Sequence, residues 1–380
     1  MKSPATKHFL VPLCLVAALA GLCFAAWSWR QVTRPGLVHF ERGLDYAAAK
    51  RMPQAEQEWL TGVREDPEFA DNHTQLGDLY SALGRFGEAA AQYQAATRLT
   101  PKDGALFLRL ARADEAAGDT KAALAAAAHA AALRPDDAET LDDYGILAAK
   151  LNRPKTARAP LARAYALAPD NADILIYLVR VEFQLQDLAG AERDLTPFVK
   201  RHPDNAEACY LMASLLNQKP LTPDTLHTAL DYARRAHAGA PGNAEASSLL
   251  GQLFLDAGNP TAALTVFRQA QAAEPHSPTV LHGLLNCYTR LHQTALAGRA
   301  SADLSAEAAR RVRIARIADR LTTDPADTTA ALAMARFREE NNELPLALGY
   351  YQQAVHHAPQ DSRARTALAD FLRRTGRQKP

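Results

Sequence analysis

Residues 70–101 read ADNHTQLGDLYSALGRFGEAAAQYQAATRLTP, and the fold can be worked out from this stretch. It closes with a proline, and prolines recur along the chain at an almost fixed interval. Six of the eight gaps between these prolines are 34 residues long, and the other two are 38 and 50. Self-similarity with a period of 34 residues is typical of an array of helix–turn–helix repeats. The nine prolines are Pro67, Pro101, Pro135, Pro169, Pro203, Pro241, Pro275, Pro325 and Pro359.

Small residues recur in register with these prolines. When each repeat is counted so that its proline falls at position 32, position 8 is Gly or Ala in seven repeats and position 20 is Ala in eight. Six repeats also carry Ala at position 27. We interpret positions 8 and 20 as the places where the two helices of a repeat press together, and position 27 as the place where the next repeat docks. The alanines at position 20 are Ala55, Ala89, Ala123, Ala157, Ala191, Ala229, Ala263 and Ala347.

Helix boundaries follow the same period. Each proline is expected to end a second helix, because it lacks the N–H that a helix interior needs. Asp or Asn follows within three residues in most repeats, and such residues cap the next helix. The predicted caps include Asp136, Asn171, Asn205 and Asn243. The turns between the two helices of a repeat are assigned to Gly84, Gly118, Gly258, Asn152 and Asn342.

The 34-residue period and the small columns, with Leu76, Gly77 and Tyr80 at positions 7, 8 and 11, resemble the tetratricopeptide repeat family. The resemblance covers residues 36 to about 375. It implies an all-α fold, a right-handed α-solenoid of helix–turn–helix repeats. The expected parts are repeats one to seven over 36–277, a divergent repeat eight with a lengthened second helix over 278–327, repeat nine over 328–361, and a C-terminal capping helix and tail over 362–380.

Three features depart from the repeat pattern. The insertion KPLTPD at 219–224 indicates an enlarged loop between the helices of repeat six. The second half of repeat eight is 16 residues too long, and 304–321 is predicted as one helix with Ser305 as its cap. Either the second helix is lengthened there, or the array breaks into two blocks. Pro160 and Pro197 fall inside second helices, so each of these helices is expected to kink or to restart.

In this family the first helix of each repeat lines a concave groove, usually through positions 2, 5, 9, 12 and 13. The resemblance therefore predicts a partner-binding groove in repeats three to six, which mixes apolar groups with two guanidinium groups. Such a surface would suit an extended or helical peptide with an apolar anchor and a carboxylate. The alternative is that several of these side chains are buried against the neighbouring first helix. The predicted groove residues are Leu108, Arg112, Ile146, Ile176, Arg180, Phe183, Tyr210, Ser214 and Asn217.

Motifs for catalysis are missing from the sequence. It contains no HExxH, CxxC or GxSxG motif and no phosphate-binding glycine loop, and its carboxylates are scattered. We therefore expect no enzyme activity, no cofactor, no metal and no small-molecule substrate. The net charge of +1 argues against nucleic acid as a partner. The basic run over 310–320 is interpreted as the solvated face of an amphipathic helix.

The N-terminus carries a long apolar segment. After a short tail over 1–8, residues 9–29 form an uncharged run of 21 residues, long enough to span the roughly 30 Å hydrocarbon core as a helix. Trp27 and Trp29 stand where interfacial aromatic residues are common. We expect an uncleaved transmembrane signal anchor, followed by a linker over 30–35. The alternative, a cleaved signal peptide, would have a shorter apolar run and a small-x-small site after it.

These features together predict a non-catalytic, membrane-anchored scaffold that binds a protein or peptide partner in its groove. Lys2 and Lys7 favour an N-terminus in the cytoplasm, so the array is expected in the periplasm of a bacterial cell, anchored in the inner membrane. A role in cell-envelope assembly is a hypothesis that rests on an analogy of fold and anchor alone. The alternative is an accessory or regulatory subunit of a separately encoded envelope enzyme, such as a glycosyltransferase or a protease.

Overall fold

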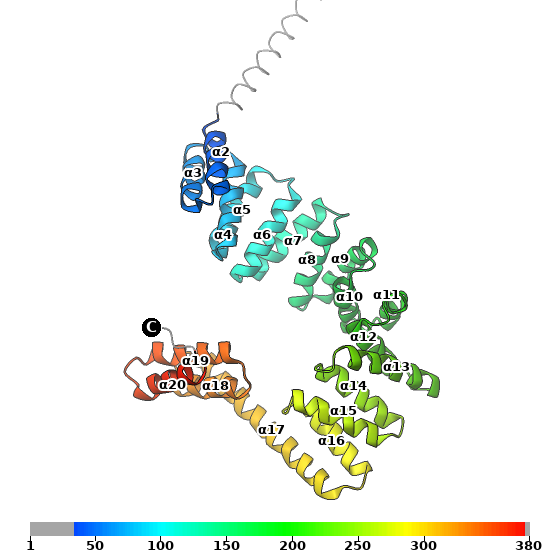
Figure 1. Ribbon diagram of the computed structural model, residues 1–380. Coiled ribbons are helices and arrows are strands. Elements are labelled where there is room, and N and C mark those ends of the chain that lie inside the picture. The colour runs from blue at the N-terminus through cyan, green and yellow to red at the C-terminus, as the bar shows by residue number, and fades with distance from the viewer. Residues whose placement is uncertain (1–33, 377–380) are drawn as a thin grey trace, which may run out of the picture. The chain divides into compact units, whose positions relative to one another are not determined.

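The computed structural model describes residues 34–376, and in this range the regular elements are all helices, labelled α2 to α20 (Figure 1). They divide into two compact units, one that ends at Pro203 and one that begins at Asp204. The first unit contains α2 (Pro35–Ala48), α3 (Met52–Glu65), α4 (Ala70–Ala82), α5 (Phe86–Leu99), α6 (Gly104–Ala117), α7 (Thr120–Leu133), α8 (Ala138–Lys150), α9 (Pro154–Leu167), α10 (Ala172–Gln184) and α11 (Leu188–Arg201). The second unit contains α12 (Ala206–Asn217), α13 (Pro223–Gly239), α14 (Ala244–Asp256), α15 (Pro260–Ala273), α16 (Pro278–Arg290), α17 (Thr294–Thr323), α18 (Thr328–Glu340), α19 (Leu344–His357) and α20 (Ser362–Arg374).

Consecutive helices pair as the repeat pattern predicts. Each even-numbered helix from α2 to α18 is the first helix of a repeat and packs against the odd-numbered second helix that follows it. Helix α20 packs against α19 and closes the last repeat. For the described residues, the predicted all-α solenoid of helix–turn–helix repeats is confirmed.

The small columns lie where the helices meet. All eight alanines at position 20 are fully buried, as predicted. At position 8, the large neighbour comes from position 24 of the second helix. A Cβ atom at Gly77 would lie 2.6 Å from the ring of Tyr93, and a Cβ atom at Gly251 would lie 2.6 Å from the ring of Phe267. The glycines therefore let a large side chain of α5 or α15 lie directly against the backbone of the first helix.

Polar caps begin the first helices. The side chains of Asn171, Asn205 and Asn243 accept backbone N–H bonds at the starts of α10, α12 and α14, as predicted. At α8 the prediction is wrong by one residue, because Asp137 is the cap and Asp136 forms an ion pair with Arg163. All five predicted turn residues have positive φ, between 54° and 89°, the region that Gly and Asn adopt most easily.

The departures from the pattern are accommodated within helices. Pro160 and Pro197 lie inside the continuous helices α9 and α11, so neither helix restarts. The long segment of repeat eight is one helix of 30 residues, α17. The prediction of Ser305 as a cap is wrong, since Ser305 lies within α17 and its hydroxyl donates to the carbonyl of Ser301. Thr222 caps α13 at the end of the insertion in repeat six.

In residues 34–376 no helix has the length and apolar character needed to cross a membrane. The predicted anchor over 9–29 lies outside the described residues.

Candidate functional site

The first helices of successive repeats share one face of each unit, which we call the first-helix face. In the first unit we follow it along α4, α6, α8 and α10, and in the second along α12, α14 and α16. The predicted groove residues lie on these helices.

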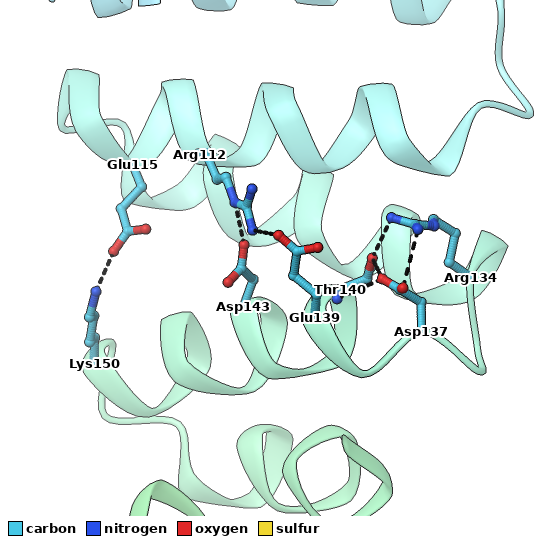
Figure 2. Close-up of polar contacts among 8 residues, drawn as sticks. All are labelled: Arg112, Glu115, Arg134, Asp137, Glu139, Thr140, Asp143 and Lys150. Atoms are coloured by element: carbon cyan, nitrogen blue, oxygen red, sulfur yellow. Dashed lines mark hydrogen bonds and ion pairs between the residues drawn. The ribbon is translucent and has the colours of Figure 1, made fainter. Parts of the chain in front are cut away.

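Ion pairs join α6 to α8 on the first-helix face of the first unit. Arg112 of α6 donates to Asp143 and Glu139 of α8, at 2.5 and 2.6 Å (Figure 2). Lys150, at the end of α8, donates to Glu115 of α6 at 2.8 Å (Figure 2). Side chains from neighbouring repeats therefore neutralise one another across this part of the face.

These pairs change the expected role of Arg112. Its guanidinium binds two carboxylates of the neighbouring helix, whereas the predicted role was to bind the carboxylate of a partner. Arg109 and Asp78 make a similar pair between α6 and α4, at 2.9 Å. Exposed ion pairs of this kind contribute only about 0–1 kcal/mol each to stability. We therefore infer that their main role is to fix the register between neighbouring repeats.

Asp142 of α8 and Asp173 of α10 are carboxylates of the same face that have no cationic partner among the described residues. The Oδ1 atom of Asp142 is buried and has no hydrogen-bond partner in the described chain. Burial, and then the negative charges of Asp143 and Asp173, raise the pKa of Asp142 to about 6. The uncompensated charge at this point of the face is therefore negative.

The predicted apolar residues of the first unit lie at different depths. Leu108 is buried in α6 and belongs to the core, which matches the alternative interpretation for this residue. Ile146, Ile176 and Phe183 are half-buried, and the side chain of Arg180 is exposed on α10. Partly exposed apolar surface thus lies on α8 and α10, beside the ion pairs.

The three predicted residues of the second unit, Tyr210, Ser214 and Asn217, lie on α12 and are half-buried. Of these, only Tyr210 lines a cavity of about 410 Å³ on the first-helix face. The cavity is also lined by side chains of α14, α15 and the start of α16. Burial, and then the charge of Glu245, raise the pKa of Tyr210 above its usual value.

Glu245 and Ser248 line the same cavity and are not among the predicted groove residues. They stand at positions 2 and 5 of repeat seven. Both positions usually face the groove in the family, so the repeat numbering points to them. The sequence prediction favoured repeats three to six because their groove positions include more apolar residues, and it therefore missed this more polar part of the face.

Two further kinds of site were predicted or excluded from the sequence, a metal site and the basic run of α17. No group of three or more His, Cys, Asp or Glu side chains in residues 34–376 is placed to hold a metal ion. In the basic run of α17, Arg310 and Arg311 pair with Glu307, and Arg320 pairs with Asp327. Much of the charge of this run is therefore balanced within the chain.

Comparison with known proteins bears on the family. Tetratricopeptide repeat models match residues 70–103, 143–195, 227–278 and 332–379. Among curated proteins, none matches the chain significantly.

Similar solved structures include PilF, PilW and YrrB. PilF of Pseudomonas aeruginosa is 15% identical, with 57% of this chain and 97% of that chain covered and a TM-score of 0.42. PilW, a widely conserved type IV pilus biogenesis factor, is 22% identical, with 56% and 96% covered and a TM-score of 0.43. YrrB, a TPR protein with an unusual peptide-binding site, is 17% identical, with 59% and 96% covered and a TM-score of 0.36. Values this low carry no information about the partner of this chain. The matched repeat models, together with the buried small columns, show that the chain contains tetratricopeptide repeats.

Proposed function

We propose that this chain is a non-catalytic scaffold that binds a protein or peptide partner on its first-helix face and is held at a membrane by residues 9–29. Tetratricopeptide repeats are in general modules for binding proteins and peptides. The observation that carries the binding proposal is the cavity of about 410 Å³ in the second unit.

This cavity collects side chains from three successive first helices. Tyr210 comes from α12, Ser248 from α14 and Thr279 from α16. Each brings a hydroxyl group, which can donate or accept a hydrogen bond. A peptide that crosses these helices would meet hydrogen-bonding groups of three repeats in turn, which suits a chain of regularly spaced peptide groups.

Selection of a displayed random peptide library against the full chain in detergent micelles tests the binding. We expect related peptides to be enriched. Gln252→Arg places a long side chain at the cavity and should weaken the binding of an enriched peptide by about tenfold or more. Thr265→Arg adds the same side chain at an exposed position of α15 and should leave the affinity for the peptide unchanged. Enrichment of no peptide, or an equal loss in both variants, would contradict the proposal.

The membrane part of the proposal is supported by the sequence of residues 9–29. A run of 21 uncharged residues is long enough for one transmembrane helix, and Arg30 and Arg34 follow it. With Lys2 and Lys7 in the cytoplasm, the repeats would lie in the periplasm of a bacterial cell. The setting that we propose is the assembly of a cell-envelope structure at the inner membrane.

Deletion of residues 1–33 tests the anchor. This deletion keeps Arg34, the residue before α2, whose guanidinium donates to the carboxylate of Asp66 after α3 at 2.8 Å. We expect the full chain to sediment with membranes and to need detergent for extraction, whereas the shortened chain should be soluble and equally helical by circular dichroism. Membrane association of the shortened chain would show that another part of the molecule holds it there.

A further inference from the structure

The charged residues that line the cavity on the first-helix face of the second unit are all acidic. Its lining includes the carboxylates of Glu245 and Glu274, and no lining residue is a lysine, arginine or histidine. Both glutamates are exposed, and neither carboxylate forms an ion pair with any residue that the structure describes. The hydroxyl of Tyr210 is hydrogen-bonded to Glu245, but no cation of the described chain neutralises either carboxylate, so a ligand that brings a positive charge would be attracted to this cavity.

Ser248 offers a ligand a second kind of contact. Its residue is only 7% exposed and lines the cavity, yet its hydroxyl has no hydrogen-bond partner within residues 34–376. The adjacent Ser247 shows the usual arrangement, because its hydroxyl donates to the carbonyl of Asn243 at 2.9 Å. Because the Ser248 hydroxyl is open to the cavity and has no partner in the described chain, it is available to donate to or accept from a ligand there.

The rest of the lining suits the stem of a long side chain. The half-buried Leu249 supplies apolar surface and Tyr210 supplies an aromatic ring, while Phe267 lies behind them and is only 1% exposed. Lysine and arginine carry an aliphatic stem that packs on apolar surface and a charged head that seeks carboxylates or aromatic rings. The cavity of about 410 Å³ has room for one such side chain and the peptide group that carries it.

We propose that this cavity binds the side chain of one lysine or arginine in a peptide partner, with the charged head near Glu245 and Glu274 and the hydroxyl of Ser248 bonded to the peptide. The inference rests on the proposed function, since it names the chemistry of the segment that the first-helix face would bind. It reverses the expectation from the sequence, in which arginines of the groove bind a carboxylate of the partner.

The peptide selection described above supplies the probe. Peptides enriched on the full chain should share a lysine or arginine at one position. Replacing that residue by norleucine, which keeps the stem and removes the charge, should weaken binding by about tenfold. The double variant Glu245→Gln/Glu274→Gln should bind the charged and the norleucine peptides equally.

A matched control makes the same change of charge elsewhere in the second unit. Asp319→Asn/Glu340→Gln removes two exposed carboxylates that do not line the cavity and should keep the preference for the charged peptide. Circular dichroism of each variant checks that it is folded. Enriched peptides without a shared basic residue, or an unchanged preference in the Glu245→Gln/Glu274→Gln variant, would overturn this inference and leave the proposed function standing. Enrichment of no peptide would overturn both.

Discussion

Replacing Gly251 by valine is expected to lower the free energy of unfolding by about 3 kcal/mol. The ring of Phe267 lies against the backbone of α14 at Gly251 and against that of α16 at Gly283, where a Cβ atom would be 2.3 Å from the ring. Because the ring is held from both sides, it cannot make room for a new side chain without opening the packing of α14, α15 and α16. Urea unfolding followed by circular dichroism measures the loss.

A glycine outside the contacts between helices provides the control. Gly349 lies in α19, is exposed, and would have no atom within 4 Å of an added Cβ. Gly349→Val should change the free energy of unfolding by less than about 0.5 kcal/mol, because only the helix propensity changes. Equal losses in the two variants would show that the small residue at position 8 is not what lets the helices nest.

The second large effect is expected at Glu182, through pH. Glu182 of α10 is 1% exposed, and neither carboxylate oxygen has a hydrogen-bond partner in the described residues. Burial raises the pKa of Glu182 to about 7; Asp194 and Asp187 add to the shift, and Arg193 and Arg158 oppose it. The protonated form is therefore favoured in the folded chain.

The direction of the pH effect follows from this shift. In the unfolded chain a glutamate has a pKa of about 4.3, so between about pH 4.3 and pH 7 the folded state holds more of the proton than the unfolded state does. Stability should therefore fall as the pH rises through this range. Glu182→Gln cannot ionise, and we expect it to be more stable than the natural chain by about 2 kcal/mol at about pH 8 and nearly equal to it at about pH 4.

Urea unfolding of both proteins at several pH values checks this expectation. The exposed Glu340 provides a control, since Glu340→Gln makes the same substitution outside the core and should show no such gain at high pH. If the difference between Glu182→Gln and the natural chain stays constant with pH, the buried carboxyl is not the group that titrates.

The repeats could be predicted because a 34-residue period constrains the same positions many times. The residue at position 20 must be small in every repeat because the two helices of the repeat press together there. The eight alanines at this position therefore support one another's interpretation. A feature that occurs once has no such support. Ser305 resembles a helix cap, but the ten residues before it, from Ala295 to Leu304, include no proline that could keep α17 from starting at Thr294.

The groove residues were harder to predict, because their role depends on the neighbouring repeat. Position 9 sets the face on which Arg112 lies, but Glu139 and Asp143 of the next helix decide that its guanidinium is paired. Leu108 also occupies a groove position, and packing in α6 buries it. Cavities are hard to predict for the same reason. The space beside Ser248 is bounded by side chains of four helices, which no single repeat specifies.

Hydrogen exchange of the full chain, with and without an enriched peptide, tests most directly whether the first-helix face binds the partner. We predict that the peptide slows exchange in α12, α14 and α16 and leaves α13 unchanged. Slower exchange confined to the second helices α13 and α15, or no change in any helix at saturating peptide, would contradict binding on this face.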